Sequence, residues 1–156
     1  MTLSYVLHKA GWATATIEHG GIHREMRVSY LSDPVWKMLD AAIGLTNGAQ
    51  EVRFGFTDEP GEHECIVTRA GSDGVKIRVF WHKDWTPPGR NTGDEVFACD
   101  SNVSEFCQTI FACCKRLLDE YGEEGYKERW VSHEFPTETF ERLSHLLYPP
   151  GRTPVA

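Results

Sequence analysis

The segment His63-Glu64-Cys65 holds two residue types that bind zinc. Alternation along a strand places His63 and Cys65 on one face, where both could reach the same metal ion. Zinc needs two further ligands, which structural sites often supply in short pairs such as C-x₂-C, and no such cysteine pair occurs. Cys113 and Cys114 are adjacent, so they point to different sides of a helix. We therefore expect no metal site and no cofactor.

A cysteine nucleophile is the second chemistry that the residue types allow. A catalytic thiol needs an exposed, electropositive surrounding that lowers its pKa. Cys107, Cys113 and Cys114 lie on or beside the apolar stripe of an expected helix, and Cys99 precedes the negative Asp100. These surroundings favour core packing over catalysis, and the sequence predicts no catalytic residue.

Carboxylates gather in two stretches, Asp58 to Glu64 and Asp119 to Glu124. Acid–base catalysis needs two carboxyl groups in a cleft with separated pKa values, whereas the first stretch reads as a solvated turn. The second places negative charge at the C-terminus of a helix, against its dipole. That conflict indicates an interaction surface, and Glu59, Glu62 and Glu123 are its candidate binding residues.

Aromatic residues form the last candidate set. Trp85 lies in a loop that Pro87-Pro88 stiffens, and Tyr126, Trp130 and His133 crowd a connector before the last helix. Trp and Tyr are frequent anchors of protein interfaces, so all four are candidate binding residues. A structural alternative is that Trp130 and the nearby Phe135 fill the gap between the last two helices.

The elements that would position these residues follow from periodicity and turn chemistry. Alternation predicts a hairpin over 12–30, with His19-Gly20-Gly21 as its turn. Asp33-Pro34 begins a helix that runs to about residue 46, and Asp100-Ser101-Asn102 caps a long helix that ends at Gly122. Strands are expected near 52–57, 63–69, 75–81 and 95–99, and a last helix at 137–147. The order β-β-α-β-β-β-β-α-α predicts an α+β fold with one antiparallel sheet of five or six strands and helices on one face.

Composition limits the class of protein. The chain has 156 residues and a formal net charge of −7, which suits one domain, expected over 1–147 with a flexible tail at 148–156. The acidic balance argues against nucleic acid or an anionic membrane as the main partner. The start, MTLSYVLHKAGW, lacks the features of a secretory signal, and five cysteines show no disulfide spacing. We therefore expect a cytoplasmic protein with free thiols.

Several segments carry a resemblance to known proteins. SYLSDPVWKMLDAAIGLTNGA, RFGFTDEPGEHECIV, VFW and EYGEEGYKERWVSHEFP resemble a family of small, uncharacterised bacterial proteins. These motifs are turn and core signatures that would cover about 12–147, and they imply a fold and no reaction. Size, acidity and element order are also similar to immunity proteins of bacterial toxin systems.

The leading functional hypothesis is a non-enzymatic binding protein of the bacterial cytosol, of the type of an immunity protein. Its partner would be another protein, for example a basic toxin or nuclease, which the acidic surface would complement. The alternative is a small-ligand-binding domain or enzyme, with a pocket between sheet and helices lined by Trp81, Tyr126 and His133. A third possibility is a homo-oligomer that assembles through an exposed sheet edge or face.

Overall fold

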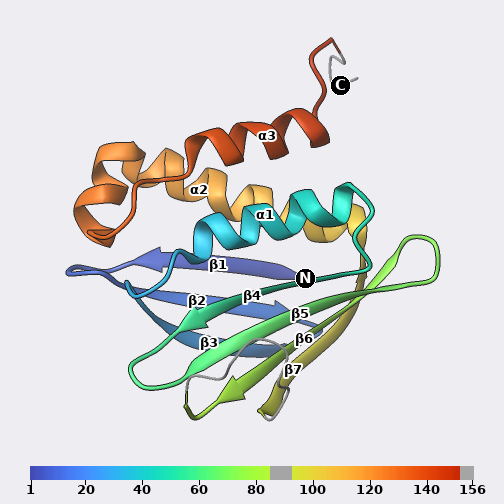
Figure 1. The fold of residues 1–156 in the computed structure, drawn as a ribbon, viewed down its shortest axis with the longest axis horizontal. Coiled ribbons are helices and arrows are strands. Elements are labelled where there is room, and N and C mark those ends of the chain that lie inside the picture. Colours follow the sequence, from blue (N-terminus) through green and yellow to red (C-terminus); the bar gives the residue numbers. More distant parts are fainter. Residues whose placement is uncertain (85–92, 152–156) are drawn as a thin grey trace.

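A computed structural model describes residues 1–84 and 93–151 of the chain. Within these residues seven strands and three helices follow one another (Figure 1). The strands are β1 (Thr2–Leu7), β2 (Trp12–His19), β3 (Ile22–Ser29), β4 (Glu51–Thr57), β5 (Glu62–Ala70), β6 (Gly74–His82) and β7 (Asp94–Asn102). The helices are α1 (Pro34–Thr46), α2 (Val103–Trp130) and α3 (Thr137–Leu147). The α+β class is confirmed, and the three helices lie together on one side of the strands.

The strands form two antiparallel sheets instead of the one sheet that the sequence predicts. β1, β2 and β3 make a three-stranded sheet, and β4 to β7 make a four-stranded sheet, each in chain order. The prediction also lacked β1, in which Leu3, Tyr5 and Leu7 face the core. The exposed Val6 hides this alternation, because it makes the stretch from Tyr5 to Leu7 continuously apolar.

Polar contacts between β3 and the β4–β5 hairpin join the two sheets. The pairs are Arg27 Nε with Asp58 Oδ1 at 2.8 Å, Ser29 Oγ with Glu59 Oε2 at 2.9 Å, and Arg24 Nη2 with His63 Nε2 at 3.1 Å. His63 is buried, and its ring lies 4.7 Å from that of Trp81 between centroids. The His63-Cys65 face, considered above for zinc, therefore belongs to the protein interior.

Helix α1 has the bounds that its sequence signals predict. The Asp33 carboxylate accepts a hydrogen bond from the Trp36 N–H at 3.3 Å, and Pro34 occupies the first turn. Its buried face includes Val35, Met38, Leu39 and Ala42, so the remaining arc at residues 36, 37 and 40 is exposed. Trp36 belongs to this exposed arc, and 42% of it is exposed.

Removing the α1 cap should destabilise the protein modestly. Asp33→Ala deletes the acceptor of the Trp36 N–H and a negative charge at the helix N-terminus, at a cost of about 1 kcal/mol. Chemical denaturation of the variant and of Asp33→Asn, which keeps an acceptor, measures this cost. Equal loss in both variants would show that capping contributes nothing.

Helix α2 is longer than predicted. Gly122, with φ 67° and ψ 175°, does interrupt the helix where the sequence places its end. Helical backbone then resumes, so that the expected connector is a second helical segment as far as Trp130. This segment buries Tyr126 and Trp130 completely, and the ring of Trp130 meets Tyr5 at 6.3 Å. A glycine can end a helix or can lie between two consecutive helical segments, and the local sequence is the same in both cases. The sequence alone therefore could not show that a second helical segment follows Gly122.

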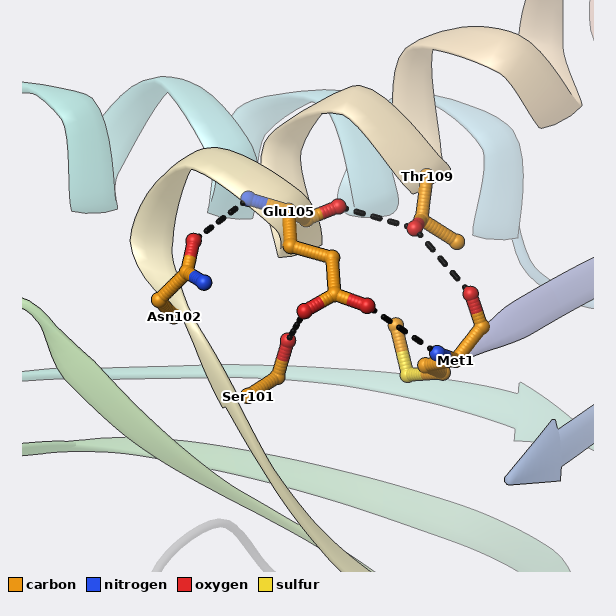
Figure 2. Close-up of polar contacts among 5 residues, drawn as sticks. All are labelled: Met1, Ser101, Asn102, Glu105 and Thr109. Carbon is orange, nitrogen blue, oxygen red and sulfur yellow. Dashed lines mark hydrogen bonds and ion pairs between the residues drawn. The ribbon is translucent and has the colours of Figure 1, made fainter. Parts of the chain in front are cut away.

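The start of α2 holds strand β1 through the contacts drawn in Figure 2. Asn102 caps the helix by accepting the Glu105 N–H at 2.8 Å, and the Glu105 carboxylate accepts from the Met1 ammonium at 3.2 Å and from the Ser101 hydroxyl at 2.8 Å. These two donors lower the pKa of Glu105. The Thr109 hydroxyl donates to the Glu105 carbonyl at 2.8 Å and also lies 3.4 Å from the Met1 carbonyl, so the first turns of α2 lie beside the start of β1.

The core lies between the sheets and the helices. All five cysteines are free and buried, as the sequence predicts for the three on α2, and burial raises the pKa of Cys113 to about 12. Tyr148, the first residue of the expected tail, lies 5.4 Å from the Phe111 ring between centroids. In the described ranges no helix is long and apolar enough to cross a bilayer.

Candidate functional site

An acidic groove of about 910 Å³ lies where α1 begins, α2 ends and α3 begins. The second segment of α2 supplies Glu123, Glu124, Lys127 and Glu128, which share one helix face because Tyr126 and Trp130 occupy the buried face. The start of α1 and the residues that lead into α3 complete it with Asp33, Trp36, Glu134, Phe135, Pro136, Thr137, Glu138 and Thr139.

Negative charge dominates the acidic groove. Six carboxylates and one lysine line the groove. The formal net charge of the whole chain is −7. The Thr137 hydroxyl donates to Glu123, which ties the start of α3 to α2. Carboxylates of one sign gathered along an open groove produce a negative local potential, which favours cationic groups. The groove is therefore suited to lysine and arginine side chains.

Asp33 lines the groove, and His133 borders it beside Asp33; we call this pair the Asp33–His133 corner. His133 Nδ1 lies 3.8 Å from Asp33 Oδ2. Desolvation raises the pKa of Asp33, against the lowering effects of the Trp36 N–H, His133 and Lys37. A cation from a partner would relieve that cost, since an opposite charge stabilises a desolvated carboxylate.

Trp36 separates the acidic groove from a smaller hollow of about 340 Å³. The floor of this hollow is β4 with the neighbouring end of β5, and its wall is the exposed arc of α1. It is lined by Trp36, Lys37, Asp40, Arg53, Phe54, Gly55, Thr57, Glu62 and Glu64. A half-exposed indole between two hollows offers a large apolar contact at low entropic cost, as interface anchors do.

The structure places the binding residues predicted from the sequence in several different locations. Glu123 lines the acidic groove, His133 borders it, and Glu62 lines the smaller hollow. Glu59 accepts the Ser29 hydroxyl and so helps to hold the sheets together. Tyr126 and Trp130 belong to the core, so they are not available as surface contacts. Trp85 lies outside the described residues.

Trp36 is the important site residue that sequence reasoning missed. A usable signal existed, because residues 36, 37 and 40 form an arc that carries Lys37 and Asp40. A tryptophan on a charged arc of an amphipathic helix faces solvent, and exposed tryptophan is a signal of binding.

The three residues expected to line the alternative ligand pocket lie in different surroundings. Trp81 packs against His63 and over Gly61, Tyr126 is enclosed in the core, and His133 lies at the acidic groove. No group of three or more His, Cys, Asp or Glu side chains that could hold a metal ion is found within residues 1–84 and 93–151. The geometry thus brings together carboxylates and a tryptophan on a surface, which is an arrangement for binding.

Comparison with known proteins gives no family. No family model matches the chain, and no curated protein matches it. Among solved structures, a chain of the "CdiA-CT/CdiI toxin and immunity complex from Enterobacter cloacae" is similar, with a TM-score of 0.45 and 7% sequence identity. The match covers 73% of this chain and 99% of that chain. A likeness of this degree assigns neither a family nor a function.

Proposed function

We propose that this protein is a non-enzymatic binding domain that inhibits a basic partner protein, in the manner of an immunity protein in the bacterial cytoplasm. The observation that carries the proposal is the acidic groove, in which six carboxylates lie beside the exposed Trp36. Carboxylates on such a surface steer a basic protein and select it, while the indole supplies apolar contact area.

The inhibition would be steric and electrostatic. Toxins that act on nucleic acids need a cationic surface for phosphate binding. A protein that covers that surface with carboxylates competes directly with the substrate. The Asp33 corner adds to affinity, because its desolvation cost is already incurred in the free protein.

Coexpression tests this function in a cell. A candidate toxin, taken from the genes that neighbour the gene for this chain, is expressed with and without the chain, and survival is scored. We expect the wild-type chain to restore growth, and the toxic partner to have a positive net charge. Restored growth by a chain with the groove carboxylates reversed, at the same level as wild type, would contradict the proposal, as would no protection by wild type.

Trp36→Ala should speed dissociation of the partner without unfolding the protein. The loss is expected to be about 2 kcal/mol or more, roughly 30-fold in dissociation rate, if the indole is a central contact. Ile22→Ala is the matched control, because Ile22 is 63% exposed on the β2–β3 hairpin, which contributes no residue to the acidic groove. Surface plasmon resonance measures both rates. Equal dissociation rates of the two variants would show that Trp36 is not part of the interface.

A further inference from the structure

Exposed apolar side chains continue the surface beyond the acidic groove. We call Tyr30, Leu31 and Val131 the apolar rim; Leu31 is 45% exposed and Val131 is 53% exposed. Three contacts bring the chain segments of the rim together. The Gly11 N–H donates to the Arg129 carbonyl at 2.9 Å while Tyr30 packs against Gly11, and His133 meets Asp33. Residues 29–33 and 129–133 therefore lie at the same end of the molecule, where α2 ends and α1 begins (Figure 1).

The approach at Gly11 leaves no room for a side chain. Its φ is 78°, and an added Cβ atom would lie 2.7 Å from the Tyr30 Cβ. The β1–β2 turn thus contacts Tyr30 on one side and the end of α2 on the other. These contacts hold the residues of the rim in fixed positions.

Val131 holds an unusual backbone conformation. Its φ of 74° and ψ of −58° are those of a γ-turn, and the Ser132 N–H donates to the Trp130 carbonyl at 2.9 Å across it. This turn is rare and strained, most of all for a β-branched residue. Glycine would fit without strain but would provide no apolar surface. The valine therefore adds exposed apolar area at a position where the fold itself favours glycine.

We propose that the partner presents an amphipathic segment, whose basic side chains enter the acidic groove while an apolar side chain covers the rim of Tyr30, Leu31 and Val131. This rests on the function proposed above and specifies the occupant of that site. Charge complementarity with the groove carboxylates indicates that one side of the partner segment is basic. The rim is continuous with the groove through the Asp33–His133 corner, so one segment can contact both. A purely basic segment would leave the rim in water.

A synthetic amphipathic peptide of leucine and lysine, the Leu–Lys peptide, is the probe, and a peptide with serine in place of every leucine is its control. Isothermal titration calorimetry should show that the wild-type chain binds the Leu–Lys peptide at least about five-fold more tightly than the Ser–Lys peptide. Val131→Gly and Leu31→Ser should each abolish most of that preference. Val131→Gly should also keep an unfolding midpoint equal to or above that of wild type, since it relieves the strained turn.

The outcomes separate the two proposals. Equal affinity of both peptides for the wild-type chain, or an unchanged preference in Val131→Gly and Leu31→Ser, would overturn the apolar rim while the groove proposal stands. No binding of either peptide would overturn both. Ile22→Ser serves as the control for loss of an exposed apolar residue elsewhere, and it should leave the preference unchanged.

Discussion

Reversing three groove carboxylates is expected to slow association with the Leu–Lys peptide by about 10- to 100-fold at low salt. The variant is Glu124→Lys, Glu128→Lys and Glu134→Lys, all exposed residues of the acidic groove. The fold should persist, because exposed substitutions usually change stability by about 0.5 kcal/mol or less each. Stopped-flow fluorescence with a labelled peptide gives the rate, which should fall steeply with added salt in wild type and little in the variant.

A matched triple variant separates position from total charge. Glu18→Lys, Glu25→Lys and Asp100→Lys change the net charge equally but are not part of the groove lining, and all three residues are exposed. Both triple variants are also compared at physiological salt, where the screening length is about 8 Å; association of this control should there stay within a few-fold of wild type, since charges beyond that length contribute weakly. Equal slowing by both triple variants would show that only net charge matters and that the groove has no special role.

The second large effect concerns acid stability and depends on His63. Burial is the largest of the effects that lower the pKa of His63 to about 4; Arg24 and His82 act in the same direction, and Asp58 opposes them. The unfolded chain has an ordinary histidine pKa near 6.5, so it binds more protons than the folded chain between these values. Stability should therefore fall as the pH falls from about 6.5 to about 4, by up to about 3 kcal/mol from this residue.

Urea denaturation across that pH range measures the effect. His63→Gln keeps an acceptor for Arg24 but cannot be protonated, so its stability should depend less steeply on pH than that of wild type. His23→Gln changes an exposed histidine of β3 and is the control. The same pH slope in His63→Gln and wild type would contradict the assignment.

The parts of the fold that short-range chemistry determines could be predicted. Asp33-Pro34 and Asn47-Gly48 bound α1 because capping and turn formation involve neighbouring residues. The strands form two sheets because β3 and β4 do not pair, and the two sheets are held against each other by the contacts of Arg24, Arg27 and Ser29 with the β4–β5 hairpin. Such contacts between distant residues leave no local pattern, so one continuous sheet was the simpler interpretation.

The candidate site was predictable only in its chemistry. The sequence indicated that carboxylates and aromatic residues would bind a partner, but it grouped them by position along the chain. Folding separates Glu59 from Glu123 and places Glu123 beside Asp33, which is far away in the sequence. Two tryptophans also differ in exposure. Trp130, in the helical segment after Gly122, is buried in the core, whereas Trp36 is exposed on α1.

The most direct test of the central claim is to map which backbone amides respond when a basic ligand binds. Heteronuclear NMR of the labelled chain, titrated with the Leu–Lys peptide, reports this for every assigned residue. Chemical-shift changes should concentrate at residues 33–37, 123–128 and 134–139, which line the acidic groove, and at the apolar rim. Changes centred instead on the outward face of β1 to β3, or no saturable change at all, would contradict the groove as the binding surface.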